Sequence, residues 1–230
     1  MTAAAQATAV IAAAGSGERL GAPLPKALVE VAGRPLVAWS LEAMAESGLV
    51  SGIVIAAPQT HLAELRELGR SAGAEVIAGG ATRAESVALA LEAVGAELVA
   101  IHDAARPMVT AGLIDSLVAG LASTPGADGV IAAAPIADTV KRVDRPRPQE
   151  PVRVVATEDR DLLWTAQTPQ VFRVQALRQA LAAPGAGITD ESMLIERTAG
   201  EVLIHPAPAT NIKVTTPEDL RVAELLLSSR

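Results

Sequence analysis

Cysteine is absent from the 230 residues of this sequence, and aromatic residues make up only 1% of it. The lack of cysteine excludes a disulfide framework and thiolate zinc sites, and the three histidines, at positions 61, 102 and 205, do not have the spacing of metal ligands. Redox chemistry is therefore not expected. With so few aromatic side chains, the core must consist of Ala, Val, Leu and Ile, a composition that favours helices packed closely on a sheet.

Long apolar runs and an excess of positive charge are absent as well. No uninterrupted apolar stretch approaches the roughly 18 to 20 residues of a membrane span, and the N-terminal MTAAAQATAV lacks the basic start and cleavage pattern of a signal peptide. We therefore expect a cytoplasmic protein with no membrane partner. The formal net charge of −7 argues against a nucleic-acid partner, because general binders of the phosphate backbone usually need a broad basic surface.

The length fits a single domain, residues 1–230. Short apolar, β-leaning segments alternate with longer helical patterns, which indicates an α/β fold with a mostly parallel sheet covered by helices on both faces. The predicted strands are 8–14, 49–57, 75–77, 98–102 and 129–135. The predicted helices are 35–47, 60–72, 83–94 and 111–123.

The alternation breaks between residues 138 and 160. There the segments TVKRV and PVRVVAT flank a Pro-rich, charged turn, DRPRPQE, with no helical pattern. We interpret this region as a long hairpin arm that packs against another subunit or over the active site, since a polar two-stranded hairpin is marginal alone. A surface loop of no consequence is the alternative.

Past the arm we expect a loop through residues 167–170, helices at 174–182 and 190–198, a strand at 201–205 and a last helix that begins at Pro217. The sequence has no internal repeat. It also has no linker rich enough in Gly and Ser to mark a second domain.

The first candidate binding motif is GSGER at residues 15–19, followed by Lys26. Glycines at a strand's carboxyl end let backbone N–H groups approach phosphate oxygens, and Arg19 and Lys26 would add the positive charge that a triphosphate needs. The dinucleotide-binding fingerprint requires a third glycine where Leu20 stands, and the Walker Gly-Lys-Ser/Thr pattern is absent. A tight turn without a ligand is the remaining alternative.

The second motif is HDAARP, in which Asp103 comes at the end of a buried strand. A carboxylate at this place is suited to bind Mg²⁺ together with nucleotide phosphates, since magnesium prefers one or two carboxylates plus phosphate oxygens and water. An N-cap or a salt bridge to Arg106 is the alternative.

The third motif is GGATRAES at residues 79–86, in which two glycines precede a predicted helix. Thr82 and Glu85 have the spacing of a capping box. The cap does not account for the paired glycines, for which we expect a close approach of the backbone to a flat base.

Late in the chain, Lys213 lies between Ile212 and Val214 in a short extended stretch. Alternation points the lysine away from these apolar neighbours. This allows a directed role, beside the usual one of a solvated surface group.

The chain closely resembles one family, 2-C-methyl-D-erythritol 4-phosphate cytidylyltransferase of the non-mevalonate isoprenoid pathway. The matching segments occur in family order over nearly the whole chain: AAAGSGERLG…PK, AGGATRAESV, VAIHDAARP, APIADTVKRV, TEDR…LWTAQTPQVF, ITDES and NIKVTTPEDL. HDAARP, TPQ-F, TDE and NIKVT are much more specific than the glycine loop, which other sugar nucleotidyltransferases share.

The resemblance implies a Rossmann-like nucleotidyltransferase fold, a homodimer with exchanged arms, CTP as donor, and Mg²⁺ or another divalent cation. The implied reaction transfers the cytidylyl group of CTP to 2-C-methyl-D-erythritol 4-phosphate with release of pyrophosphate. Position by position, it implies catalytic roles for Arg19, Lys26 and Lys213; CTP contacts from Ala13, Ala14, Gly15, Gly17, Gly80, Ser86 and Asp103; metal binding by Asp103; and methylerythritol phosphate contacts from Thr139, Arg160, Arg106, Thr168 and Thr189, with Asp190 in support.

The chain departs from the family at Ala81, since the family often has an acidic residue after the paired glycines. A related alternative is a cytidylyltransferase for another polyol phosphate, such as ribitol 5-phosphate, from which TVKRV and Arg160 distinguish this chain by resemblance. An alternative of another class is a catalytically silent nucleotide-binding module on the same fold. It is disfavoured because every charged position expected for catalysis is occupied.

Overall fold

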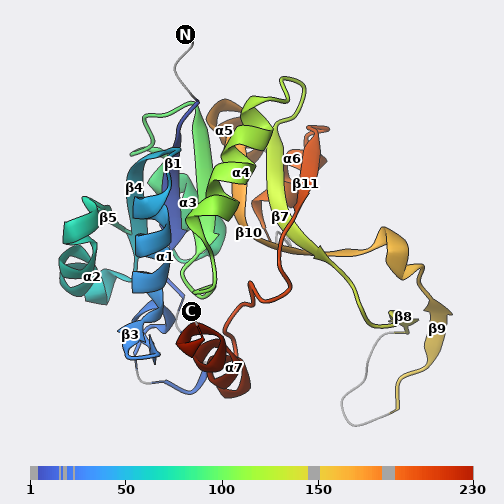
Figure 1. The fold of residues 1–230 in the computed structure, drawn as a ribbon. Coiled ribbons are helices and arrows are strands. Elements are labelled where there is room, and N and C mark those ends of the chain that lie inside the picture. The colour runs from blue at the N-terminus through green and yellow to red at the C-terminus, as the bar shows by residue number, and fades with distance from the viewer. Residues whose placement is uncertain are drawn as a thin grey trace.

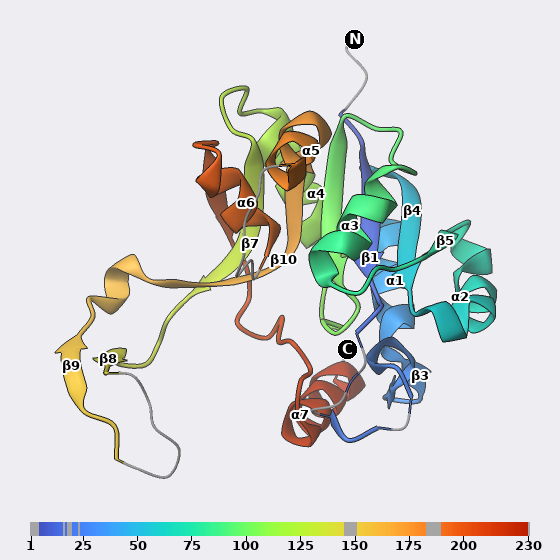
Figure 2. The same ribbon diagram turned by 180° about the vertical axis from the view of Figure 1, so that it is seen from behind.

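The structure, a computed structural model, describes residues 5–15, 17, 20–22, 24–144, 151–182 and 190–229. They form a central seven-stranded sheet with helices on both faces (Figures 1 and 2), as the alternating pattern predicts. A hairpin stands away from this body. None of the helices in the described ranges is both long enough and apolar enough to span a membrane.

The sheet has six parallel strands and one reversed strand. In spatial order its strands are β11 (Val202–Pro206), β7 (Gly129–Pro135), β10 (Trp164–Arg173), β6 (Leu98–Asp103), β1 (Ala7–Ala12), β4 (Val50–Ala57) and β5 (Glu75–Ala78). Only β10 among them is antiparallel to its neighbours, β6 and β7. Two small hairpins pair β2 (Glu30–Val31) with β3 (Arg34–Pro35) and β8 (Lys141–Val143) with β9 (Val154–Thr157).

Most of the helices lie between these strands in the chain, and the last helix follows the last strand. The α-helices are α1 (Leu36–Glu46), α2 (Leu62–Gly69), α3 (Arg83–Leu91), α4 (Ala111–Ala122), α5 (Val174–Ala182), α6 (Glu191–Arg197) and α7 (Pro217–Ser228). Short 3-10 helices are η2 (Lys26–Leu28), η3 (Gln59–His61), η4 (Arg70–Ala72) and η5 (Arg160–Leu162).

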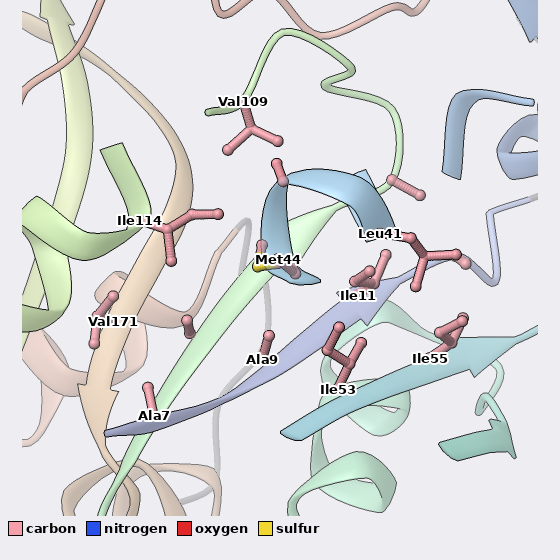
Figure 3. Packing of buried hydrophobic residues seen from close by; sticks show 14 of the residues in the cluster. Ala7, Ala9, Ile11, Leu41, Met44, Ile53, Ile55, Val109, Ile114 and Val171 are labelled. Carbon is pink, nitrogen blue, oxygen red and sulfur yellow. The ribbon is translucent and has the colours of Figure 1, made fainter. Parts of the chain in front are cut away.

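Two apolar cores cover the two faces of the sheet, because successive strand residues point to opposite faces. On β1, Ala7, Ala9 and Ile11 pack with residues of α1, α2 and α4, whereas Val10 packs with residues of α3, α5 and α6 on the other face. Figure 3 shows the first of these clusters, in which Met44 of α1 lies above the sheet. Small alanines on β1 let the helices approach closely, as the composition predicts.

Most predicted elements are confirmed, two of them at both ends: the strand at 129–135 and the helix at 174–182. The helix predicted at 60–72 is divided into η3, α2 and η4, and the helix predicted at 83–94 ends at Leu91. The loop predicted at 167–170 is wrong, because these residues lie within β10. Its register shifts between Ala166 and Gln170, around a cis bond before Pro169, so the usual strand pattern is hidden in the sequence.

The predicted hairpin between residues 138 and 160 is confirmed by the pairing of β8 with β9. An ion pair between Arg142 and Glu158, with Nε and Oε1 2.5 Å apart, joins its two sides. Most of the turn between these strands, residues 145–150, lies outside the described residues. We call residues 138–160 the arm.

Candidate active site

A cavity of about 610 Å³ opens at the carboxyl ends of β1 and β6. The chain goes from β1 to β4 and β5 on one side and to β6 on the other, so the strand order reverses here, which is where open α/β sheets bind their ligands. The volume is within the range of small-molecule sites. Its lining consists of Ala12, Ala13, Ala14, Gly15, Gly17, Lys26, Ala27, Gly80, Ala81, Thr82, Arg83, Ser86, Asp103, Ala104, Ala105, Lys213 and Thr215.

The glycine-rich turn brings Lys26 to the cavity. The N–H of Lys26 donates to the carbonyl oxygen of Gly15 at 3.3 Å. Gly17 has φ +75°, and a Cβ atom there would lie 3.2 Å from the backbone nitrogen of Lys26. The backbone conformation therefore favours glycine, and any other residue here would also press on the backbone of Lys26. The predicted Arg19 lies outside the described residues.

The paired glycines lie against the first turn of α3. Thr82 caps the helix by accepting from the N–H of Glu85, while the Glu85 carboxylate accepts from the N–H of Ala81 rather than from that of Thr82. A Cβ atom on Gly80 would lie 2.4 Å from Cβ of Glu85. Close packing of this turn on the helix therefore requires Gly80, whatever ligand the cavity holds. The hydroxyl of Ser86 fixes the turn by accepting from the N–H of Gly80 at 3.0 Å.

Asp103 lies at the end of β6 and is held by two cations. Its Oδ1 accepts from Nε of Arg83 at 3.0 Å, and its Oδ2 lies 2.6 Å from Nζ of Lys213. Arg83 also contacts Glu191, which is 1% exposed. Asp103 does not form the direct salt bridge to Arg106 that was the alternative interpretation. The guanidinium of Arg106 instead donates to the carbonyl oxygens of Asn211 and Ala166.

These contacts shift the pKa values of the cluster. Burial alone would raise the pKa of Asp103, but the charges of Arg83 and Lys213 outweigh it and hold that pKa well below its usual range. Burial would lower the pKa of Arg83, and the two carboxylates raise it instead. Burial raises the pKa of Glu191, which Arg83 opposes. Asp103 is therefore an anion in the folded protein at neutral pH.

A buried hydrogen-bond network lies behind Asp103. The hydroxyl of Thr168 accepts from the N–H of Asp103 at 3.1 Å, and Nδ1 of His102 lies 3.1 Å from the same oxygen. Nε2 of His102 lies 3.2 Å from the carbonyl oxygen of Arg106, which can only accept, so Nε2 bears the proton and Nδ1 accepts from Thr168. Burial lowers the pKa of His102 to about 4, so the ring is neutral at pH 7.

The predicted site residues fall into two groups. All seven residues predicted around CTP line the cavity together with Lys26 and Lys213: Ala13, Ala14, Gly15, Gly17, Gly80, Ser86 and Asp103. The residues predicted for the acceptor, where the structure describes them, are not in that lining: Thr139, Arg160, Arg106 and Thr168. Thr189 lies outside the described residues. Asp190 caps α6.

Thr139 and Arg160 are exposed and lie at the root of the arm. The guanidinium of Arg160 donates to the carbonyl oxygen of Ala137 at 2.6 Å, so it ties the last residue of the arm to the residue before the first. Thr168 supports Asp103 from behind, and Arg106 ties the loop after β6 to the segment before α7. A single chain therefore does not bring Thr139 and Arg160 to the cavity lining.

Sequence reasoning missed two residues of the site, Arg83 and Glu191. Arg83 belongs to GGATRAES, which predicts a helix start, and Glu191 belongs to ITDES, which carries part of the family resemblance. Neither motif by itself indicates a role in the site for these two residues. One feature common to both could have indicated them: each motif has a charged residue at the first position of its helix, directly after the N-cap. That the two pair across 108 residues of chain is a fact of the tertiary structure.

Asp103 is the residue suited to hold a cation. No group of three or more His, Asp and Glu side chains that could enclose a metal occurs among the described residues. Among the residues that the structure describes, Asp103 is the one acidic residue that lines the cavity. One carboxylate beside a space for phosphates fits Mg²⁺, which commonly binds through one or two carboxylates together with substrate phosphates.

A glycine turn, two lysines and one carboxylate at the switch point of a mostly parallel sheet define an α/β protein that binds a phosphorylated ligand, and comparison with known proteins narrows this class to nucleotidyltransferases. The chain belongs to the 2-C-methyl-D-erythritol 4-phosphate cytidylyltransferase family, whose model matches residues 7–229. The family's fold and class of activity, expected from the resemblance, are thereby confirmed.

Individual relatives agree with this assignment. A curated 2-C-methyl-D-erythritol 4-phosphate cytidylyltransferase of Synechococcus sp. (strain CC9902) is 44% identical over 228 residues, covering 96% of this chain and 97% of that protein. The crystal structure of 4-diphosphocytidyl-2C-methyl-D-erythritol synthase from Anaerococcus prevotii DSM 20548 matches with a TM-score of 0.83 at 26% identity, over 98% of this chain and 100% of that one. The crystal structure of the cytidylyltransferase from Thermus thermophilus matches with a TM-score of 0.76 at 29% identity, over 97% of this chain and 99% of that one.

Proposed function

We propose that the protein transfers the cytidylyl group of CTP to 2-C-methyl-D-erythritol 4-phosphate, giving 4-diphosphocytidyl-2-C-methyl-D-erythritol and pyrophosphate. Family membership supports this reaction, and one observation in the cavity carries the chemistry: Asp103 and Lys213 meet at 2.6 Å in a cavity that is also lined by the glycine turn and Lys26. Such a site has positive charge for a triphosphate and one carboxylate for its divalent cation.

The cofactor in this proposal is Mg²⁺ or another divalent cation, held by Asp103. When bound with nucleotide phosphates, such an ion neutralises part of their charge and orients them. Lys213 occupies Oδ2 of Asp103 in the structure, and its side chain is 41% exposed. It can therefore leave the carboxylate and turn to the phosphates when nucleotide and cation enter together.

The reaction is an in-line attack on the α-phosphorus of CTP. A phosphate oxygen of the acceptor forms the new P–O bond, and the bond to the β-phosphate breaks, so that its electron pair leaves with pyrophosphate. Lys26 and Lys213, with Arg19, offset the charge that develops on the five-coordinate phosphorus and on the leaving group. Catalysis then consists of alignment and charge neutralisation.

No general base is required, because the attacking phosphate is already ionised. The nearest histidine fits this account. His102 is fully buried, both of its ring nitrogens are engaged, and it does not line the cavity. Its function is to hold Thr168, which in turn holds the backbone of Asp103.

The acceptor part of the site is proposed to come from a second subunit. The arm stands away from the body (Figure 1). Apolar side chains face solvent on the arm and directly after it: Val154 and Val155 are 54% and 59% exposed, and Leu162 is 79% exposed. Apolar patches of this kind mark interaction surfaces, and a two-stranded hairpin is marginal without a partner. In a homodimer with exchanged arms, Thr139 and Arg160 of one subunit would reach the methylerythritol phosphate bound to the other.

The test is pyrophosphate release by the purified protein with Mg²⁺, with CTP, UTP, ATP and GTP each crossed against methylerythritol 4-phosphate, ribitol 5-phosphate and no acceptor. We expect turnover only with CTP and methylerythritol phosphate. Turnover with ribitol phosphate instead would contradict the proposed acceptor but not the proposed nucleotide substrate. Nucleotide binding without turnover in any combination would favour a silent binding module.

A further inference from the structure

Glu191 is a buried carboxylate next to the cavity that the proposed reaction does not use. It is 1% exposed and does not line the cavity, and its side-chain partner is Arg83, which does line it. A buried charge is costly unless it is paired, and removing one member of a buried pair is strongly destabilising. Because burying the Glu191 carboxylate is costly and Glu191 does not line the cavity, we expect Glu191 to have an effect that acts through Arg83.

Arg83 joins two carboxylates. Its Nε donates to Oδ1 of Asp103 at 3.0 Å, and another nitrogen of the same guanidinium contacts Glu191. Lys213 is the second cation on Asp103. With all four groups ionised, the cluster has no net charge while Lys213 stays in place. Once Lys213 turns to the nucleotide, Asp103, Glu191 and Arg83 together keep one negative charge.

Without Glu191 the net charge of the cluster is different. Arg83 would then neutralise Asp103 alone, and the departure of Lys213 would leave a pair with no net charge to attract a cation. We propose that Glu191 is a positioning residue that neutralises Arg83, so that Asp103 stays available to the divalent cation after Lys213 has left it. This inference rests on the proposed function, in which Asp103 binds the cation.

The structure holds Glu191 firmly in place for this role. Asp190 caps α6 by accepting from the N–H of Met193 at 3.2 Å, and its other carboxylate oxygen accepts from Nε2 of Gln170 on β10 at 3.1 Å. Arg83 is fixed as the first residue of α3 behind the Thr82 cap. Both members of the pair therefore start from rigid elements, which suits the outer partners of a metal ligand.

The experiment separates charge from structural damage by measuring two affinities that should change in opposite directions. Mn²⁺ alone is titrated into Lys213→Met and into Lys213→Met/Glu191→Gln, with the free ion measured by electron paramagnetic resonance. CTP in EDTA is titrated calorimetrically into the natural protein and into Glu191→Gln. Glu196→Gln, in place of an exposed glutamate on the same helix, is the matched control for both titrations.

We expect the Glu191 change to weaken Mn²⁺ binding by about tenfold to a hundredfold, the usual cost of losing an outer partner of a metal ligand. Metal-free CTP should bind more tightly to Glu191→Gln, because the net charge of the groups at the cavity is then more positive by one unit. Glu196→Gln should change neither affinity by more than about twofold, as is usual for an exposed charge.

Two results would overturn the inference while the proposed function stands: affinities unchanged by Glu191→Gln in a protein that turns over, or affinities that both fall together. Absence of Mn²⁺ binding in both Lys213→Met proteins would instead remove Asp103 as the metal site, and the inference with it. If Glu191→Gln does not fold, Arg83→Gln/Glu191→Gln replaces it with Lys213 kept, since neither Arg83 nor Glu191 is then left without its partner and Asp103 still pairs with Lys213. Mn²⁺ affinity in that double variant should stay within about threefold of that of the natural protein, and a tenfold loss would contradict the role of Glu191.

Discussion

Nζ of Lys213 lies 2.6 Å from Oδ2 of Asp103, so in the structure the cation proposed to bind phosphate forms an ion pair with the carboxylate proposed to bind metal. The two groups are far apart in the sequence, at the end of β6 and in the segment before α7. In the structure each is a counter-ion of the other, and in the proposed function nucleotide and cation would replace this pairing. This exchange of partners has a direct consequence for mutants.

Lys213→Met should reduce kcat/KM by about a hundredfold to a thousandfold, the typical loss for one preorganised donor. The same variant should bind Mn²⁺ more tightly than the natural protein when nucleotide is absent, since Oδ2 of Asp103 no longer has an ammonium partner. Steady-state kinetics and a Mn²⁺ titration measure the two effects. Arg221→Met, which removes a cation that is 76% exposed on α7, is the control and should leave both unchanged. Turnover of Lys213→Met within threefold of the natural protein would refute the assignment.

Gly17→Ala and Gly73→Ala form a matched pair. Both glycines have positive φ, +75° and +62°, so alanine should cost roughly 1–2 kcal/mol of stability at either position. A Cβ atom at Gly17 presses on the backbone of Lys26, whereas nothing lies within 4 Å of one at Gly73. We therefore expect Gly17→Ala alone to lose about a hundredfold in turnover, the cost of a small misplacement of a catalytic group. Equal activity of the two variants would mean that the glycine turn does not position Lys26.

Thr168→Val should lower the free energy of unfolding by about 1–3 kcal/mol, because it leaves the buried N–H of Asp103 and Nδ1 of His102 without their shared partner. Urea denaturation measures the loss. Thr165→Val on the same strand is the control: Thr165 is an exposed residue whose hydroxyl donates to the carbonyl oxygen of Ala134, and the loss of this bond should cost no more than about 0.5 kcal/mol. A similar cost for the two variants would contradict the importance of the network behind Asp103.

Stability should fall with acid through His102. Its pKa is lowered to about 4 in the folded protein from an ordinary value of 6.5, so the unfolded chain binds the proton more tightly. The stabilisation from the neutral ring is complete above pH 6.5 and is lost as the pH falls towards 4. The difference corresponds to about 3 kcal/mol. Chemical denaturation at several pH values should show this slope in the natural protein and a shallower slope in His102→Gln, and equal slopes would contradict it.

Val155→Lys tests the proposed dimer. The valine is 59% exposed on β9, and a buried, unpaired lysine in the interface would shift the equilibrium towards monomer. Val222→Lys, at a 46% exposed valine on α7, is the control and should leave the mass unchanged. Analytical ultracentrifugation over a range of concentrations distinguishes the two. A natural protein that is monomeric throughout would contradict the exchanged arms.

The parts of the fold that follow from periodicity were predictable. β1 and β7 have apolar runs that mark a buried parallel strand, and α5 has a clear apolar face. β10 was not predictable in the same way. Gln167, Thr168 and Pro169 read as a loop, because their strand-forming role depends on β6 and β7 lying at both sides and on a register shift that no local pattern reveals.

The site was predictable to the same degree. Motifs place Gly17, Lys26 and Asp103 at strand ends, and the topology of an α/β sheet brings strand ends together. The pairing of Arg83 with Glu191 depends on how α3 and α6 pack behind the sheet, and the sequence gives no sign of which charges meet. The packing role of Gly80 against Glu85 was hidden for the same reason, since only the fold shows which atoms a Cβ would strike.

Strand β10 has one further consequence. It begins at Trp164, soon after the arm ends, and its residue Thr168 lies directly behind Asp103. The strand ends at Arg173. One strand thus leads from just past the arm to the residue that holds the backbone of Asp103. We therefore expect a partner that binds the arm to restrict the motion of Asp103 as well.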